Sequence, residues 1–562
     1  SIENSDVCLL IIEATEGKGF YKSTNRGASW DKQSEWSTAG NYYQEIYCDP
    51  KNADKVYSMD TWLMVTTDGG KTFKGLGEKN KHVDNHAIYV DPRNTAHLLV
   101  GCDGGLYESF DAAATWDFKA NLPITQFYRV CVDNEKPFYN IYGGTQDNNT
   151  LGGPSRTKSA SGIINADWFV TVGGDGFQAR VDPTEPNIVY SEWQYGGLVR
   201  FDKKSGEAID IRPQEKPGET AYRFNWDAPL LISNFDNKRI YFAANKVFRS
   251  DDRGNTWKVI SNDLTRQVDR NKFPVMGKVW SMDAVAKNQS TSLYGNITAL
   301  AESPKNENII YAGTDDGLIQ TTTDGGKTWN KVSQLPATTV AGVTLGPLVN
   351  FMIASQHDEN VAYAALNNHR NGDFKPYLVK TSDKGKTWTS VTGNLPAGGA
   401  AYSMAEDHIN KNLLFCGTEF GFYFSNDGGK NWIEIKAGLP EAICIKDIAI
   451  QKRENDIVIA TFGRGFYVID DYSLLQNIKK EDLDKKATIF PIKDGLVYNE
   501  STPYGHKGKS FQGASMFTTN NPPMGANITY YQKDAYKSLK DKRKEAEKEK
   551  IKAGKDVYYP NA

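Results

Sequence analysis

The chain has 562 residues, far more than one hydrophobic core needs, so its length predicts several domains or a repeat array. Its 66 Lys and Arg against 69 Asp and Glu give a formal net charge of -3, which excludes a basic nucleic-acid surface and the acidic excess of a disordered chain. The 50 Gly, 12 Trp, 29 Tyr and 25 Phe favour short strands and tight turns over long helices.

From the N-terminus onward, one octapeptide of the form S/T-x-D/N-x-G-x-T-W/F recurs, and we call it the box. Its seven copies are STNRGASW (23–30), TTDGGKTF (66–73), SFDAAATW (109–116), SDDRGNTW (250–257), TTDGGKTW (322–329), TSDKGKTW (381–388) and SNDGGKNW (425–432). The closing aromatics of the first three boxes, Trp30, Phe73 and Trp116, are 43 positions apart, and a repeat of this length indicates a solenoid or a propeller.

The acidic or amide side chain of each box predicts a turn, because it can accept hydrogen bonds from backbone N–H groups a few positions on while Gly takes positive φ. We therefore assign a structural role, not an acid/base role, to Asn25, Asp68, Asp111, Asp252, Asp324, Asp383 and Asp427.

Around each box lies the same unit, shown by HAIYVDPRNTAHLLVGCDGGLYESFDAAATW (86–116): strand, turn, strand, Gly-rich turn, strand, box. Four-stranded propeller blades are the natural packing of such an all-β unit. Two units between Trp116 and Trp257 lack the box, and the polar stretch 266–292 predicts an insertion. The fold class is thus all-β with propeller blades, and NPPMGANITYYQKD (521–534) looks like the opening strand of a β-sandwich that follows them.

The boxes resemble the Asp-box, or BNR, repeat of sialidases, tandem-propeller xyloglucanases and sortilin-type ten-bladed propellers. VDNHAIYVDP, YGGTQDNNT, NGDFKPYLVKTSD, FGRGFYVIDD and NPPMGANITYY look more closely like a group of secreted bacterial proteins labelled glycosyl hydrolase or sortilin-like. Where that group usually has a His in the last blade, this chain has Phe462. The resemblance implies a secreted or cell-surface location, further blades before Ser1 and a sandwich continuing after Ala562.

The domain prediction follows from the repeat and the resemblance together. Residues 1–122 are expected to supply the last blades of a first propeller, and residues 123–475 a seven-bladed propeller. Residues 476–515 would form a linker, and residues 516–562 the start of a β-sandwich with a charged helical insertion. One ten-bladed ring is the alternative to tandem seven-bladed rings.

Ligands of propellers usually bind at the loops that connect strands 2 and 3 and successive blades. The weak catalytic candidates among the polar residues there are Asp84, Asp227, Asp315 and Glu419. The ligand-binding candidates are Asn85, His86, Asp103, Tyr128, Gln146, Asp147, Asp175, Arg223, Trp226, Asp316, His369, Arg370 and Arg464. His86 has no HxxxH or CxxC partner, so no metal is predicted, and no cofactor either.

Three functions remain open. The chain could bind a peptide, protein or oligosaccharide at its loop face, serve as a rigid scaffold in a surface assembly, or hydrolyse glycosides with two carboxylates. No apolar run is long enough to span a membrane, so direct membrane insertion is not expected. We rank binding or scaffolding above hydrolysis and a non-enzymatic role above an enzymatic one, because the one strong motif is structural.

Overall fold

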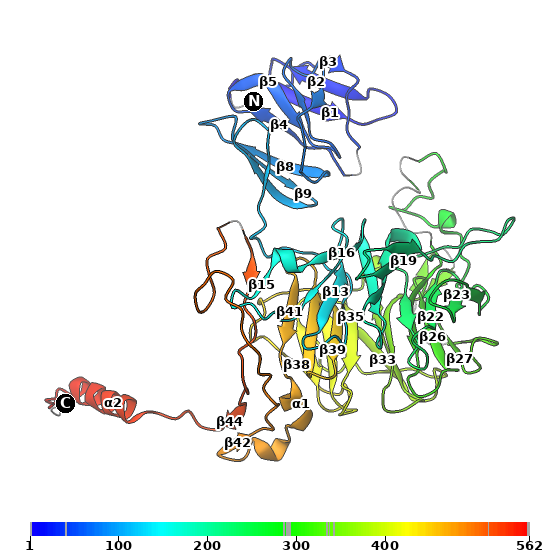
Figure 1. The fold of residues 1–562 in the computed structure, drawn as a ribbon. Helices are drawn as coiled ribbons and strands as arrows, with labels where there is room; N and C mark the ends of the chain where they lie inside the picture. The colour runs from blue at the N-terminus through cyan, green and yellow to red at the C-terminus, as the bar shows by residue number, and fades with distance from the viewer. Residues whose placement is uncertain are drawn as a thin grey trace. The chain divides into compact units, whose positions relative to one another are not determined.

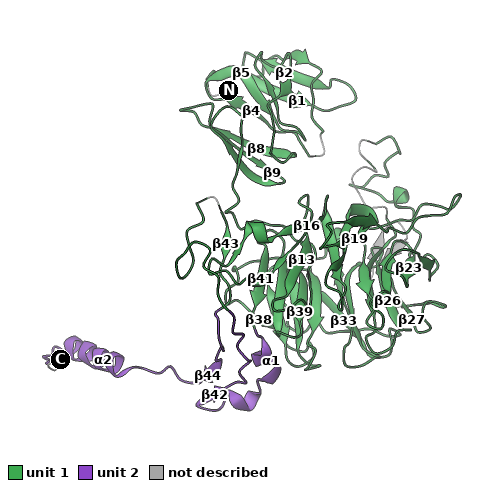
Figure 2. Cartoon of the chain, in the orientation of Figure 1, with its two compact units in different colours: residues 1–470, 499–522 green, residues 471–498, 523–562 purple. Residues whose placement is uncertain are grey.

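The computed structural model describes residues 3–39, 42–284, 287, 294–332, 335, 338–340, 343–514 and 516–558, with backbone alone for 338–340 and 343–345. The chain divides into two compact units, Ser1–Asp470 with Asn499–Pro522 and Asp471–Tyr498 with Pro523–Ala562 (Figure 2). Strands dominate the first unit (Figure 1).

Residues 1–122 form three antiparallel sheets whose strands pair in chain order. The strands are β1 (Cys8–Ile12), β2 (Gly19–Ser23) and β3 (Asp31–Ser34); β4 (Ile46–Asp49), β5 (Asn52–Ser58), β6 (Met64–Thr66) and β7 (Lys74–Gly75); β8 (Asn85–Val90), β9 (Leu98–Cys102), β10 (Gly105–Ser109) and β11 (Asp117–Phe118).

Seven further antiparallel sheets follow, and we number them as blades 1 to 7. Blade 1 has β12 (Cys131–Val132), β13 (Asn140–Gly144), β14 (Thr150–Pro154) and β16 (Phe169–Val172); blade 2 has β17 (Gly176–Val181), β18 (Ile188–Trp193), β19 (Gly197–Asp202) and β20 (Ala208–Asp210); blade 3 has β21 (Leu230–Ile232), β22 (Ile240–Ala243), β23 (Val247–Ser250) and β24 (Lys258–Val259); blade 4 has β25 (Ile297–Glu302), β26 (Ile310–Thr314), β27 (Ile319–Thr322) and β28 (Asn330–Lys331). Blade 5 has β31 (Leu348–Ala354), β32 (Ala362–Asn367), β33 (Tyr377–Thr381) and β34 (Thr389–Ser390); blade 6 has β35 (Ala401–Glu406), β36 (Leu414–Thr418), β37 (Phe422–Ser425) and β38 (Ile433–Glu434); blade 7 has β39 (Ile445–Gln451), β40 (Asp456–Thr461) and β41 (Phe466–Ile469).

Short elements lie between and beside the blades. They are β15 (Ile163–Ile164), which pairs with β43 (Thr518–Thr519), the pair β29 (Thr338–Val340) and β30 (Val343–Leu345), and the 3-10 turns η1 (Asn165–Asp167), η2 (Gln194–Gly196), η3 (Arg270–Lys272) and η4 (His369–Asn371). The predicted insertion 266–292 contains η3, while residues 285, 286 and 288–292 lie outside the described residues.

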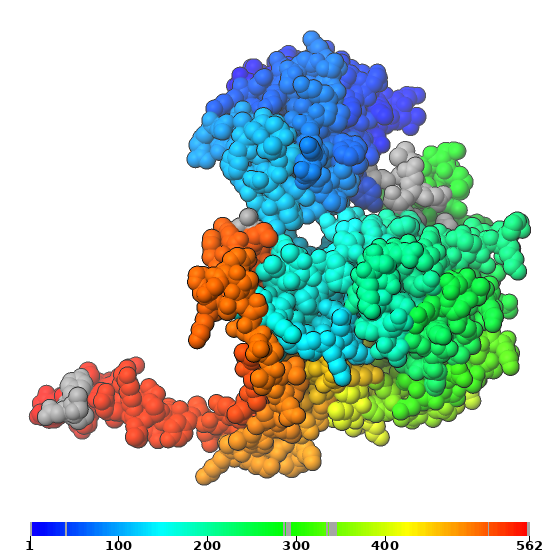
Figure 3. All heavy atoms as spheres, viewed as in Figure 1, coloured from blue at the N-terminus to red at the C-terminus, as the bar shows by residue number. Residues whose placement is uncertain are grey.

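The seven blades close a ring. The first strands contact one another in the series β12, β17, β21, β25, β31, β35 and β39, and β39 contacts β12 again. Along the visible side of the ring, atoms of successive blades are in contact (Figure 3). Closure at seven rules out the alternative of one ten-bladed ring, and the all-β propeller prediction is confirmed.

Apolar side chains pack between neighbouring blades, and they form buried clusters that join one blade to the next. Tyr190 and Leu198 of blade 2 pack with Ile240 and Phe242 of blade 3, all at 0% exposure. At the closing boundary, Ile141 of blade 1 belongs to one cluster with residues of β40. Burial of this kind supplies most of the stabilisation of an all-β ring.

Each box forms a turn between the last two strands of its sheet, with the side-chain oxygen of its Asp or Asn accepting hydrogen bonds. In blade 4, Asp324 Oδ1 accepts the backbone N–H of Thr328 at 2.9 Å, and Oδ2 accepts its hydroxyl at 2.6 Å. The Thr328 hydroxyl and backbone lower the pKa of Asp324 to about 2. The closing Trp329 then donates its indole N–H to Ile260 O of blade 3 at 3.0 Å, so the box also ties one blade to the preceding one.

The second unit contains α1 (Ser473–Asn477), η5 (Lys480–Asp482), the pair β42 (Ala487–Ile489) and β44 (Tyr530–Gln532), and the exposed, charged helix α2 (Leu539–Lys552). The predicted linker 476–515 thus contains η5 and β42, whereas a sandwich after residue 516 stays a prediction. Among the described residues, no helix is both long and apolar enough to cross a membrane.

Candidate functional site at the propeller channel

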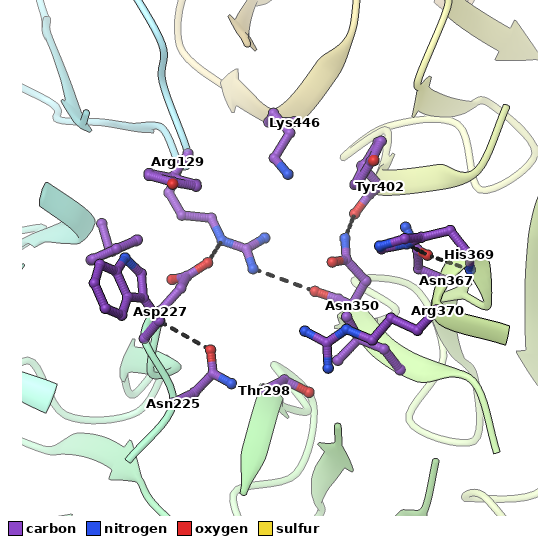
Figure 4. Close-up of a pocket in the computed structure, with 14 residues that line it drawn as sticks. Arg129, Asn225, Asp227, Thr298, Asn350, Asn367, His369, Arg370, Tyr402 and Lys446 are labelled. Carbon is purple, nitrogen blue, oxygen red and sulfur yellow. Dashed lines mark hydrogen bonds and ion pairs between the residues drawn. The ribbon is translucent and has the colours of Figure 1, made fainter. Parts of the chain in front are cut away.

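A cavity of about 350 Å³ opens where the first strands of the ring converge (Figure 4). All seven blades contribute to its wall, directly or through the segments that precede or follow their strands. The lining residues are Tyr128, Arg129, Phe177, Asn225, Trp226, Asp227, Thr298, Leu348, Asn350, Asn367, His369, Arg370, Tyr402 and Lys446. Polar residues among apolar strand neighbours reach the channel because side chains alternate along a strand.

One wall is organised by an ion pair. Arg129 Nε lies 2.7 Å from Asp227 Oδ2, and Gln178 Nε2 donates to Asp227 Oδ1 at 3.0 Å. Arg129 also donates to Asn350 O at 3.4 Å across the channel. Beneath this wall, burial raises the pKa of Glu192 well above its usual range. Asp227 is therefore held by an arginine and an amide.

Next to Arg129, on the neighbouring blade 7, a lysine lies over aromatic rings (Figure 4). The ammonium of Lys446 lies 4.2 Å from the ring centre of Tyr402 and 5.2 Å from that of Phe462. Burial lowers the pKa of Lys446. Such cation–π contacts stabilise the charge without neutralising it.

Next to the cavity lies a pair of carboxyl groups on two neighbouring loops. Asp147 stands in the β13–β14 turn, and Asp175 stands between β16 and β17. Gln146 Nε2 is 2.8 Å from Asp147 Oδ1 and 3.3 Å from Asp175 Oδ1, so one amide bridges the two carboxyls. The backbone N–H of Asp147 also donates to Asp175 Oδ1 at 3.0 Å.

Glycine brings these loops together. A Cβ on Gly144 would lie 2.0 Å from the backbone N of Phe177, so only Gly lets the end of β13 approach the start of β17 this closely. Asp147 and Asn149 adopt left-handed backbone, with φ of 59° and 74°. Conformations of this kind in non-Gly residues cost free energy and concentrate at functional loops.

The two carboxyls differ in their environment. Burial, followed by the adjacent Asp147, raises the pKa of Asp175 to about 7. Asp175 is 6% exposed, while Asp147 is partly exposed. A carboxyl that keeps its proton near neutral pH beside a second carboxyl is the arrangement that acid/base catalysis uses. Tyr128 links this pair to the cavity, because its hydroxyl donates to Gln146 Oε1.

The four catalytic candidates from the sequence do not come together. Asp227 is ion-paired, and Asp84 accepts the Tyr43 hydroxyl in the first group of sheets. Asp315 is 6% exposed and accepts the N–H groups of residues 295 and 296, which is a structural role. Glu419 accepts only the N–H of residue 400, at 3.4 Å, among the hydrogen bonds of the described residues.

The ligand-binding candidates separate into three groups. Tyr128, Trp226, His369 and Arg370 line the cavity, and Gln146, Asp147 and Asp175 form the adjacent cluster. The others make local contacts or lie exposed: Asn85 with Lys81, His86 with Asp103, Arg223 with Asp263, Asp316 with Arg266, and Arg464 at the surface.

Sequence reasoning missed much of the cavity, including Arg129, Asn350, Asn367, Tyr402 and Lys446. Four of these residues lie in or beside first strands, and Asn367 ends the second strand of blade 5, so none lies in the Gly-rich loops on which the prediction depended. A signal was present in CIKDIAI, where Lys446 and Asp447 interrupt an apolar strand.

The closed ring of blades 1 to 7 and its channel cavity define the class of this part of the chain as a seven-bladed β-propeller. No protein-family model matches the chain. The chain is similar to the oligoxyloglucan-reducing end-specific xyloglucanase of Emericella nidulans, at 22% identity over 610 residues, covering 81% of this chain and 72% of that protein.

Two further xyloglucanases show the same level of identity. The one of Paenibacillus sp is 22% identical over 526 residues, covering 78% of this chain and 46% of the relative. Xyloglucanase Xgh74A of Acetivibrio thermocellus is 22% identical over 357 residues, 57% of this chain, and the match spans 39% of that relative's length. Among solved structures, the Niastella koreensis GH74 enzyme matches at 14% identity and a TM-score of 0.24, covering 83% of this chain and 77% of that one.

These comparisons correct one prediction. The ranking of a non-enzymatic role above an enzymatic one is wrong, because the relatives matched over as much as 81% of the chain carry the names of glycoside hydrolases. The sequence argument failed because a structural motif says nothing against catalysis elsewhere in the fold. The hydrolase alternative is the better supported function, and the ligand class that these names favour is an oligosaccharide.

Proposed function

We propose that the protein is a glycoside hydrolase acting on xyloglucan-type polysaccharides or oligosaccharides, with Asp175 as the proton donor and Asp147 as the second carboxylate. The observation that carries this proposal is the pair itself: two carboxyls bridged by Gln146, one of them with its pKa raised to about 7. The names of the matched relatives support the substrate class. A polysaccharide substrate also suits the secreted or surface location that the resemblance implies.

The chemistry divides between the two groups. Protonated Asp175 would donate its proton to the glycosidic oxygen as the C–O bond breaks, and the leaving sugar would depart as an alcohol. Asp147 would stabilise the positive charge that develops on the sugar ring, or deprotonate the attacking water. Addition of one water across the broken bond completes hydrolysis. Gln146 would hold the two carboxyls in hydrogen-bond contact with each other, which favours a pre-organised site.

The test is hydrolysis of xyloglucan and oligoxyloglucans by the whole chain and by three single variants. We expect Asp175→Asn and Asp147→Asn each to lower kcat/KM by about 100-fold or more, the usual contribution of a positioned acid or base. Asp324→Asn is the matched control, because another box already has Asn25 at this position. Equal activity of Asp175→Asn and the parent chain would refute the assignment, and a folded chain that cuts no glycan would refute the function.

A further inference from the structure

More cationic side chains line the channel cavity than its one ion pair neutralises. The side chains of Arg129, Lys446 and Arg370 point toward its middle (Figure 4). Arg129 is neutralised by Asp227 at 2.7 Å. Within the part of the chain that the structure describes, neither Lys446 nor Arg370 forms a hydrogen bond or an ion pair with a carboxylate, so among the lining residues three cations face the single carboxylate of Asp227.

The lysine is held without being neutralised. Its ammonium lies over Tyr402 at 4.2 Å, and Phe462 and Tyr128 are 5.2 and 5.9 Å from it. Burial also lowers its pKa, because the charged ammonium is less stable away from bulk water. A cation in this position gains most from an anion that enters the cavity.

The rest of the wall suits a sugar ring. Trp226 is fixed edge-on by Tyr195, with ring centres 4.7 Å apart and planes at 74°. The amide groups of Asn350 and Asn367 line the same space, and amides beside aromatic rings are suited to hydroxyl groups on a flat apolar face. A volume of about 350 Å³ is at the small end of ligand sites, the scale of one sugar unit.

We propose that this cavity binds an acidic sugar unit, a uronate, with its carboxylate between Lys446 and Arg370 and its ring against the aromatic wall. This is a binding site separate from the Asp147–Asp175 pair, and it does not depend on hydrolysis. The carboxylate would supply the negative charge that the wall lacks, and the amides would receive the ring hydroxyls.

Isothermal titration of the whole chain tests the site, with D-galacturonate and D-glucuronate as probes, and galactose and glucose as their neutral counterparts. We expect the uronates to bind at least about tenfold more tightly than the neutral sugars, since a hydrogen-bonded ion pair is worth at least this much. Lys446→Gln and Arg370→Gln should each weaken uronate binding by a similar factor. Arg464→Gln, an exposed arginine outside the cavity, should leave it unchanged.

Three outcomes would overturn the proposal: equal binding of neutral and acidic sugars, no uronate binding by the folded chain, or tighter binding of a peptide carboxylate or of inorganic phosphate than of either uronate. Lys446→Arg guards against misfolding, since it keeps the charge and should keep most of the binding. Binding of the free uronates is measured without xyloglucan and without turnover, so failure of this site and failure of the proposed function give different results.

Discussion

Aspartate has three different roles in this propeller, and the surroundings of each carboxyl decide between them. Asp324 receives donors from its own turn, which lower its pKa to about 2. Asp315 is buried, and burial raises its pKa to about 7 although residues 295 and 296 donate to it. Asp175 reaches a similar pKa beside a second carboxyl at a partly open loop. The third arrangement combines a held proton with a second carboxyl, Asp147, on a partly exposed loop that substrate can reach.

The pH dependence of activity tests the role of Asp175. Because the proton donor must be protonated, kcat/KM for xyloglucan should fall as pH rises through about 7, where Asp175 loses its proton. The measurement is a pH–rate profile from pH 5 to 9 with Asp324→Asn as the control, which should keep the same alkaline limb. A profile that stays flat to pH 9 would exclude Asp175 as the acid.

The raised pKa of Asp315 predicts that the stability of the folded chain depends on pH. Its pKa is raised from 3.8 to about 7 in the folded chain, so between these values the folded state holds a proton that the unfolded state has released. Stability contributed by this group is therefore present at low pH and lost as pH rises toward 7. Asp315→Asn should gain stability relative to the parent chain between pH 4.5 and pH 8. The urea unfolding midpoints of the variant and of the parent chain at pH 4.5 and pH 8 measure this gain. A difference between the two midpoints that is the same at both pH values would contradict the prediction.

Whether a site residue lies in a loop or in a strand explains whether it could be predicted from the sequence. Trp226 and His369 follow loop signals, so the rule that propeller ligands bind at converging loops selects them. Lys446 and Arg129 belong to or border apolar strands, and their side chains reach the channel only because of strand pairing and blade order. Sequence periodicity gives the alternation of side chains but not which face lines the channel.

At the scale of single elements, the box is a turn held by its first hydroxyl as much as by its carboxylate. Thr322 is fully buried. Its hydroxyl oxygen accepts the backbone N–H of Gly326 at 2.9 Å and donates to Asp324 Oδ1 at 2.8 Å. The repeat made these elements predictable, because seven copies specify the turn, whereas the boxless blades 1 and 2 were recognised only by their strand outline.

Substitution of Thr322 isolates that hydroxyl. Thr322→Val keeps the shape but leaves the partly buried N–H of Gly326 without its acceptor, so the free energy of unfolding should fall by about 1 kcal/mol. Thr322→Ser keeps the hydroxyl, and other boxes have Ser250 and Ser425 at this position, so it should cost less. Urea unfolding of both variants measures these changes in the free energy of unfolding. An equal loss of unfolding free energy in the two variants would show that packing, not the hydrogen bond, stabilises the turn.

At the scale of the whole propeller, the boundary between blades 7 and 1 differs from the others because no loop joins its sheets directly in sequence. Phe127 N–H donates to Thr461 O at 3.0 Å, and the Tyr139 hydroxyl donates to Asp456 Oδ2 at 3.0 Å. Gln451 is 1% exposed and donates to Asp133 O at 2.9 Å. The ring is therefore closed by side-chain and backbone contacts between its two ends.

This boundary should be the first to open, because blade 7 is tethered to blade 1 only through the long segment that returns as β43 to pair with β15, whereas a direct loop tethers the blades at every other boundary. Gln451→Met removes a buried closing hydrogen bond at similar volume, and we expect amide hydrogen exchange in β12 and β39 to accelerate about tenfold or more. Gln356→Met is the matched control, because Gln356 donates to Glu406 O at 3.3 Å across the boundary between blades 5 and 6. If the control accelerates exchange in β31 and β35 as strongly, then closure of the ring has no special weakness and every boundary contributes equally to its stability.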